Sequence, residues 1–318
     1  MTFKIDESLH WTDHYVKYGF AALKGLVDRS WCDRALDEVR RIVGDDQPLT
    51  EWVNDRPGKY NLTDAHPGQW HYPFFQDPGR TGWTPQNPIL ETLYDQPRLK
   101  AALDRMHRGP DVWDGARNYY IFLNPYNPEA GSRIEPKGHI DFKAPIPTLY
   151  RGFTFQIALV DTEPFSGNTT IFPGTHVPVQ KTLMKEPDRK LTLADEHLTG
   201  PVEPYEFVAE AGDVLFIHHL VYHAASPSHS PGRKPRLGLH AESFRKEWLT
   251  SIDPDAPDLS PWHRSLALNG YYETRDEAVL QRARRKRHLE QIEAEKGIRI
   301  EDKWKRYSDW PTPPAVWG

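Results

Sequence analysis

Residues 211–223 read AGDVLFIHHLVYH, in which a glycine-aspartate turn opens the apolar run of residues 213–217. A short apolar run bounded by turn residues is typical of a buried β-strand. Further short runs on both sides are apolar or alternate between apolar and polar residues, and they cover residues 119–123, 153–160, 169–172 and 237–243. Turn segments such as NPYNPEAG (124–131) and SPSHSPGRKP (226–235) separate several of them. Many short strands joined by turns predict a sandwich or a double-sheet jelly roll.

Helical patterns lie outside this strand-rich region. Residues 19–27 (GFAALKGLV) predict a strand, and apolar residues at helical spacing predict a helix over 29–43. A second helix is expected at about 89–106, and a highly charged helix at about 275–295 follows a capping-box pair, Thr274 and Glu277. Residues 44–88 show no clear period, so we expect a functional cover or an insertion there.

These elements predict one domain that is mainly β with flanking α-helices. It comprises a strand and helix region at 1–110, a double-stranded β-helix (jelly-roll, cupin-like) core at about 111–248, and a helical C-terminal extension at about 249–318.

The composition excludes several kinds of protein. Cys32 is the only cysteine in 318 residues, so neither an internal disulfide nor a cysteine-based zinc site is available. No run approaches the length of a membrane span, and the charged N-terminus lacks the apolar segment of a signal peptide, so we expect a cytoplasmic protein without a membrane partner. The basic run RARRKR (282–287) shares its predicted helix with acidic residues, and the net charge is −5, which favours a solvated face over a nucleic-acid site.

The segment KGHIDF (137–142) places His139 and Asp141 two residues apart. On a strand, alternate side chains point to the same face, so an imidazole and a carboxylate can converge on one ion. Two histidines and one carboxylate on one side of a metal form the facial triad of non-haem iron oxygenases, which keeps positions open for substrate and oxygen. The spacing alone is not specific, because His240/Glu242 and His288/Glu290 repeat it. The surrounding sequence must discriminate.

The surrounding segments resemble the phytanoyl-CoA dioxygenase family of 2-oxoglutarate oxygenases. The matching segments are GHID (138–141), SGNTTIFPGTH (166–176), GDVLFIHHLVYH (212–223) and RKPR (233–236). In that family an H-x-D strand is followed by a glycine-rich turn into a PGSH or PGTH segment, then by a GD-initiated strand that ends in the distal histidine, with an arginine further on. The early GFAALKGLVDRSWCDRALDEV (19–39) is similar to the family's opening strand and helix, so the resemblance covers roughly residues 15–43 and 119–243.

The resemblance implies that His139, Asp141 and His223 are the metal ligands, and that an arginine binds the far carboxylate of the co-substrate 2-oxoglutarate. Two candidates exist for the arginine. Arg236 opens a predicted strand, from which its side chain can point into the barrel, whereas Arg233 lies in a turn but nearer the family's usual spacing. A bidentate arginine on a rigid strand suits a carboxylate best, so we favour Arg236.

Other positions follow from the same resemblance. Gln156 and Asn124 match positions near the co-substrate, although Gln156 can equally be a satisfied core amide. Ala225 replaces the small hydroxyl residue that the family has two positions after the distal histidine, so one expected hydrogen bond to the co-substrate is missing. We expect structural or supporting roles for three further histidines, His176, His218 and His219.

The resemblance also implies a reaction. It is that of an Fe(II)- and 2-oxoglutarate-dependent dioxygenase that consumes O2, releases succinate and CO2, and oxidises an aliphatic C–H bond of a small organic molecule, with hydroxylation and a place in natural-product or secondary metabolism as the expectation. Arg133, Lys137 and Lys143 suit an anionic substrate or, equally, form a solvated loop.

Two alternatives from other classes stay open. One is a cupin-type metal oxygenase that does not use 2-oxoglutarate, and the other is a non-catalytic small-molecule-binding protein on the same fold. The sequence predicts neither the prime substrate nor the oligomeric state.

Overall fold

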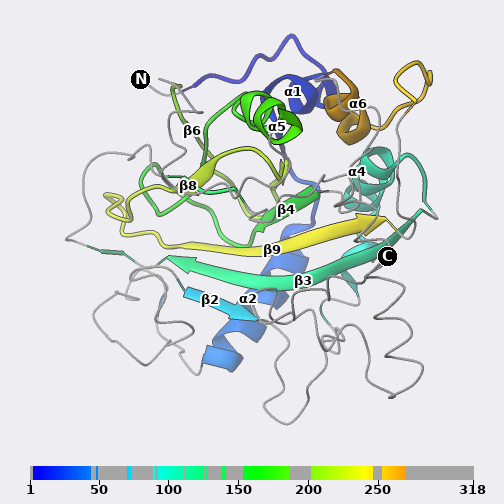
Figure 1. The fold of residues 1–318 in the computed structure, drawn as a ribbon. Helices are drawn as coiled ribbons and strands as arrows, with labels where there is room; N and C mark the ends of the chain where they lie inside the picture. The colour runs from blue at the N-terminus through cyan, green and yellow to red at the C-terminus, as the bar shows by residue number, and fades with distance from the viewer. Residues whose placement is uncertain are drawn as a thin grey trace, which may run out of the picture.

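Two antiparallel sheets form the centre of the molecule (Figure 1). The computed structural model describes residues 3–43, 48, 70–73, 89, 92–110, 112–124, 126–127, 138–140, 153–185, 202–245 and 253–268. Within these ranges, one sheet has six strands in the order β1-β7-β4-β9-β3-β2, and the other has three in the order β6-β5-β8. The large sheet consists of β1 (Phe20–Leu23), β2 (Trp70–Pro73), β3 (Trp113–Asn124), β4 (Phe153–Ala158), β7 (Val214–Ile217) and β9 (Arg236–Arg245). The small sheet consists of β5 (Thr169–Ile171), β6 (Tyr205–Glu206) and β8 (His223–Ala225).

Helices flank the sheets, as expected. They are α1 (Trp11–Tyr18), α2 (Arg29–Val43), α4 (Pro97–His107), α5 (His176–Lys185) and α6 (Pro261–Leu268), and a 3-10 turn, η2 (Thr92–Asp95), precedes α4. In Figure 1, α1, α5 and α6 lie together on the side of the small sheet. None of the described helices is long and apolar enough to cross a membrane.

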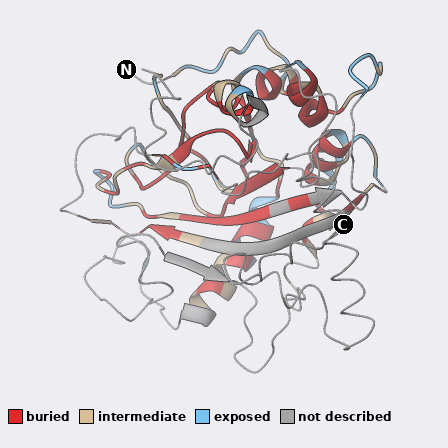
Figure 2. Cartoon of the chain, in the orientation of Figure 1, coloured by how far each residue is buried: buried red, intermediate tan, exposed pale blue. Residues whose placement is uncertain are grey.

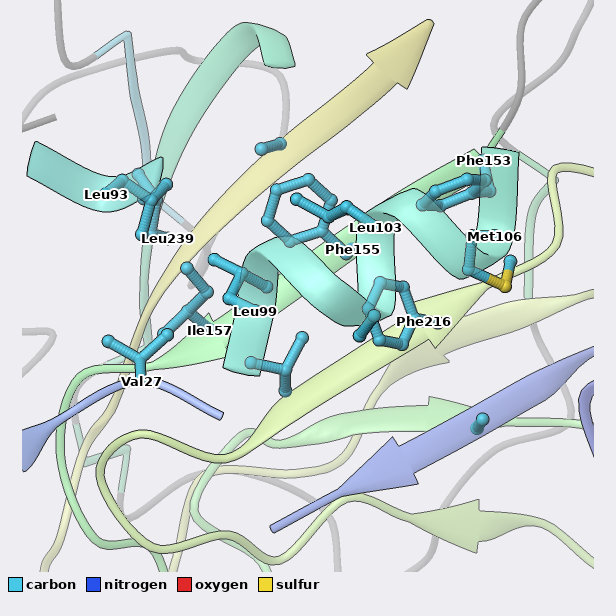
Figure 3. Close-up of a cluster of buried hydrophobic side chains, with 14 of the residues drawn as sticks. Val27, Leu93, Leu99, Leu103, Met106, Phe153, Phe155, Ile157, Phe216 and Leu239 are labelled. Atoms are coloured by element: carbon cyan, nitrogen blue, oxygen red, sulfur yellow. The ribbon is translucent and has the colours of Figure 1, made fainter. Parts of the chain in front are cut away.

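One face of the large sheet carries the main hydrophobic core. Alternate residues of its strands, among them Phe155, Ile157 and Leu239, pack against α2, η2 and α4. Figure 3 shows Leu99, Leu103 and Met106 of α4 meeting side chains of β4, β7 and β9. Burial of each large apolar side chain contributes about 1.5–3 kcal/mol, so this face supplies much of the stability.

The opposite face of the large sheet looks toward the small sheet. Because side chains alternate along a strand, residues such as Gln156 and Arg236 lie on this inner face while their neighbours join the core. Figure 2 shows that buried residues run along β4 and the middle of β9. In the small sheet, β5 is buried, whereas β6 and most of β8 are half-buried. The inner face is apolar near β7, where Leu215 and Ile217 join a second cluster, and polar near β9.

The predicted class, mainly β with flanking helices and a jelly-roll core, is confirmed. The predicted helix at 29–43 matches α2, whose residues Trp31, Cys32, Ala35 and Val39 are buried. Two expectations were too long: the strand at 19–27 is reduced to β1, and in the helix expected at 89–106, α4 begins only at Pro97. Proline suits the first helical turn because it lacks the N–H that would have no partner there. The charged helix at 275–295 lies outside the described residues.

Candidate functional site

His139 and His223 lie next to each other although 84 positions separate them in the sequence. Their backbones form an isolated antiparallel bridge, with N···O distances of 2.8 Å from His139 N to His223 O and 3.0 Å in the reverse direction. The centroids of the two imidazole rings are 4.4 Å apart. A Cβ at Gly138 would lie 2.9 Å from His223 O, so the glycine before His139 permits this close approach.

The histidine pair suits a metal ion. Nδ1 of His223 lies 3.1 Å from Val221 O, and a proton on Nδ1 donated to that carbonyl leaves Nε2 as the basic nitrogen. Neutral imidazole in a tautomer fixed by such a hydrogen bond is the usual form of a metal-binding histidine. Asp141, the predicted third ligand, lies outside the described residues, and within the described ranges no three His, Cys, Asp or Glu side chains converge on a metal position.

Arg236 begins β9 and its guanidinium lies on the inner face of the large sheet. Nη2 donates to Gln156 Oε1 at 2.9 Å, Nη1 donates to Gly167 O at 3.4 Å, and the guanidinium carbon is 5.0 Å from the centre of the Phe122 ring. Thr169, from the small sheet, donates its hydroxyl hydrogen to the same Gln156 oxygen. One amide oxygen therefore connects the two sheets beside Arg236.

Arg236 is a half-buried cation. No carboxylate of the described residues lies within ion-pair distance of it. Burial lowers the pKa of Arg236 to about 9, because the charged form loses hydration. The side chain is still protonated at neutral pH, so this region attracts an anion.

The strand pairing of the small sheet links the surroundings of Arg236 to His223. In the β5–β8 pairing, Thr169 is opposite Ala225 and Ile171 is opposite His223. Two residues along a strand span roughly 7 Å. Gln156, which both Arg236 and Thr169 contact, is therefore linked through Thr169 to a position two residues along β5 from the one paired with His223.

Of the other predicted residues, Asn124 lies beside Arg236, whereas Arg233 lies in an exposed turn. Asn124 is buried at the end of β3, and its Nδ2 donates to Gly167 O at 2.6 Å, the carbonyl that Arg236 also uses. Gly167 has φ of 75°, and a Cβ there would lie 2.6 Å from that of Asn124, so this carbonyl position depends on glycine. Arg233 is instead exposed, in a turn with φ of 52°, and its guanidinium carbon is 4.8 Å from the centre of the Tyr126 ring.

Two residues at the site were not predicted. Thr169 contacts Gln156 directly, and His240 Nδ1 lies 3.3 Å from Gln156 Nε2. The alternation of β9 was the available indication for His240, because residues 236, 238 and 240 share one face. The sequence interpretation instead considered His240 only as an alternative to His139.

Two further histidines of the segments that resemble the family, His176 and His218, are buried. His176 begins α5, is fully buried, and its Nε2 lies 3.2 Å from Val16 O. Burial lowers the pKa of His176 to about 4. Nδ1 of His218 accepts from Leu220 N at 3.1 Å, and burial also lowers the pKa of His218. Structural roles for both remain our prediction.

Comparisons with known proteins give a family and a fold. No curated protein sequence matches the chain. Among solved structures, the non-haem α-ketoglutarate-dependent carbocyclase SnoK from nogalamycin biosynthesis is 14% identical, with a TM-score of 0.52 over 80% of this chain and 89% of that chain. The epimerase SnoN from the same biosynthesis is 19% identical (TM-score 0.49; 74% and 79% covered), and HygX from Streptomyces hygroscopicus, with nickel and 2-oxoglutarate bound, is 13% identical (0.48; 80% and 94%).

At these identities the SnoK comparison supports a shared fold and nothing more specific. The sequence itself gives the family. The family model described as phytanoyl-CoA dioxygenase (PhyH) matches residues 15–236, which is more than half of the chain and includes the histidine pair and Arg236. The chain belongs to the phytanoyl-CoA dioxygenase family, as its motifs predicted.

Proposed function

We propose that this protein is an iron(II)- and 2-oxoglutarate-dependent dioxygenase that hydroxylates an aliphatic C–H bond of a small organic molecule. The family uses iron(II), 2-oxoglutarate and O2, which agrees with the cofactors expected from the sequence. The observation that carries the proposal is Arg236, a half-buried cation with no carboxylate partner among the described residues. Through Gln156 it is linked to Thr169 of β5, the strand that pairs with His223, and His223 lies beside His139.

His139, His223 and Asp141 would hold the metal. The two imidazoles are already adjacent, and the hydrogen bond from His223 Nδ1 to Val221 O orients one of them. When bound, iron(II) supplies the oxygen activation that couples conversion of 2-oxoglutarate to succinate and CO2 with oxidation of the substrate.

Arg236 would bind the far carboxylate of 2-oxoglutarate. A guanidinium presents parallel N–H donors that match a carboxylate, and the pairing strengthens where water is excluded. Phe122 on one side and Gln156 on the other restrict the guanidinium. Because Arg233 is exposed and stacked on Tyr126, we assign this role to Arg236 and not to Arg233.

The prime substrate enters the proposal only as a class. We propose a small organic molecule as the substrate. An anionic substrate is favoured by three basic residues that lie outside the described residues, Arg133, Lys137 and Lys143. The cupin-type alternative, an oxygenase that does not use 2-oxoglutarate, does not require an arginine that binds a far carboxylate. The binding-protein alternative predicts binding without turnover.

The test is turnover of the co-substrate alone. Purified protein is incubated with iron(II), 2-oxoglutarate and O2, and succinate is quantified by nuclear magnetic resonance, with His223→Ala, Arg236→Met and Arg233→Met measured in parallel. We expect slow succinate formation in the wild type and in Arg233→Met, and none above background in the other two variants. Wild-type protein that binds iron but neither binds nor consumes 2-oxoglutarate would overturn the proposal in favour of the cupin-type alternative.

A further inference from the structure

The amide of Gln156 has only one possible orientation. Arg236 has N–H donors and no acceptor, so the Gln156 atom 2.9 Å from Nη2 must be the oxygen. Thr169 then has to donate its hydroxyl hydrogen to that oxygen. His240 is directly opposite Gln156 in the β4–β9 pairing, and the amide nitrogen of Gln156 points to Nδ1 of His240. Because the amide nitrogen donates, this Nδ1 must be the unprotonated ring nitrogen.

This orientation directs the amide oxygen toward Arg236 and Thr169. The oxygen receives two hydrogen bonds, one from each neighbour, and is therefore committed within the protein. We therefore infer that Gln156 affects the co-substrate through Arg236, in place of the direct contact expected from the sequence. Among the described residues, Gln156 and Gly167 accept hydrogen bonds from two of the five guanidinium N–H groups, which leaves the others for a ligand.

The neutral character of Gln156 matters for this role. A glutamate at the same place would hold the guanidinium equally well but would cancel its charge, and a cancelled charge no longer attracts a carboxylate. An amide oxygen holds Arg236 by a hydrogen bond and leaves the positive charge for the anion. Within the described part of the chain, the site therefore combines a hydrogen-bonded arginine with a charge that no carboxylate neutralises.

We propose that Gln156 and Thr169 are positioning residues for Arg236: the Thr169 hydroxyl fixes the Gln156 amide, and the amide fixes the guanidinium in the orientation that binds the far carboxylate of 2-oxoglutarate. This inference rests on the proposed function. Holding a long side chain in one geometry before the ligand arrives reduces the entropy cost of binding. Thr169 also lies opposite Ala225, so it provides a hydroxyl where β8 has none.

The chain contains a matched control for Thr169. Thr170, the next residue of β5, is also buried, but its hydroxyl has no hydrogen-bond partner in the described structure. Replacement of either threonine by valine removes one hydroxyl from the same strand without a large change in volume. Only Thr169→Val removes a contact to Gln156.

The experiment measures the dissociation constant of 2-oxoglutarate by calorimetry under anaerobic conditions with iron(II), together with KM and kcat for succinate formation. The variants are Thr169→Val, Thr169→Ser, Thr170→Val, Gln156→Met and Gln156→Glu, and their melting temperatures report folding. We expect the dissociation constant to rise roughly tenfold in Thr169→Val and Gln156→Met, since each loses one hydrogen bond in a chain that ends on a charged group.

Other variants distinguish positioning from general packing. We expect Thr169→Ser and Thr170→Val to bind like the wild type, and Gln156→Glu to show the largest loss, because it neutralises Arg236. KM for 2-oxoglutarate should rise while kcat at saturation changes little. In an Arg236→Lys background, which still binds 2-oxoglutarate weakly, Thr169→Val should cause a smaller loss than in the wild type, because the residue acts through the guanidinium.

Wild-type affinity in Thr169→Val and Gln156→Met, or an equal loss in Thr170→Val, would show that these residues do not position Arg236. A wild-type protein that binds no 2-oxoglutarate at all would instead refute the proposed function, so the two failures are distinct.

Discussion

Arg233 and Arg236 are three positions apart but lie in different surroundings. Arg233 is exposed in a turn, whereas Arg236 lies on the inner face of the large sheet beside Gln156 and has a pKa lowered by burial. The sequence supported both as candidates, and family spacing slightly favoured Arg233. The alternation of side chains along β9 is the physical reason to prefer Arg236.

A first prediction separates the two arginines by a change that keeps the charge. Arg236→Lys should raise the dissociation constant of 2-oxoglutarate at least about tenfold, because lysine presents a single ammonium in place of a planar fork of donors. Calorimetry under anaerobic conditions measures this constant. A larger loss in Arg233→Lys than in Arg236→Lys would contradict the assignment.

A second prediction concerns acid stability. His176 is neutral in the folded protein, with a pKa of about 4, while its unfolded form has an ordinary value near 6.5. Below about pH 6.5 the unfolded state binds a proton that the folded state does not, so stability is complete above this pH and is lost as the pH falls toward 4. His14 and His218, whose pKa values burial also lowers, act in the same direction.

Urea denaturation at several pH values measures the effect. We expect the free energy of unfolding to fall by up to about 1.4 kcal/mol per pH unit for each such histidine. His176→Gln should be less stable than the wild type at pH 7 but should depend less on pH in this range. An unchanged pH dependence in the variant would show that His176 does not cause the loss.

At the scale of elements, α1 meets α5 through a glycine. Gly19 ends α1 with φ of 80°, and a Cβ there would lie 2.7 Å from Nδ1 of His176, the first residue of α5. Gly174, just before α5, has almost the same backbone conformation, with φ of 79°, but a Cβ there would have nothing within 4 Å. The two glycines therefore share the backbone requirement and differ in packing.

The third prediction uses this pair. Gly174→Ala should lower the free energy of unfolding by about 1–2 kcal/mol, because alanine is strained in the left-handed conformation. Gly19→Ala should cost clearly more, because its methyl group also collides with the buried His176 ring. Thermal unfolding of both variants checks the difference, and equal losses would show that the approach of α1 to His176 is not tight.

Elements with a strong local pattern were predictable from sequence. The run 213–217 and the helix at 29–43 closely match β7 and α2, because apolar residues at strand or helix spacing enter one core. β8 has only three residues, too few to show alternation. α5 contains Pro178, which usually argues against a helix but is tolerated in the first turn.

The candidate site was predictable to a similar extent. Family motifs indicated His139, His223 and Arg236, and the structure brings the two histidines into contact and places Arg236 on the inner face. Thr169 and His240 were not identified, because their proximity to Gln156 depends on strand pairing and on the packing of two sheets. A single sequence does not display such pairings.

At the scale of the whole molecule, the main hydrophobic core and the proposed site lie on opposite faces of the large sheet. The outer face packs its apolar residues on α2 and α4, and the inner face near β9 holds the polar group around Arg236. The stability supplied by the apolar core on one face offsets the unfavourable burial of polar groups on the other face. Changes in the two regions should therefore have different consequences.

The fourth prediction tests this division. Leu103→Ala removes a fully buried side chain of α4 and should lower the free energy of unfolding by about 2–5 kcal/mol. The dissociation constant of 2-oxoglutarate should stay at the wild-type value at temperatures where the variant is folded. Urea denaturation and calorimetry measure the two quantities, and weaker binding by the folded variant would show that the core and the site are coupled.

The most direct test of the central claim is an anaerobic titration with iron(II) followed by 2-oxoglutarate, recorded by visible absorption. In the wild type we predict a weak charge-transfer band that appears only when both are present, and that is absent in His223→Ala and Arg236→Met at the same concentrations. Wild-type protein that binds iron(II) but develops no band with 2-oxoglutarate would contradict the account.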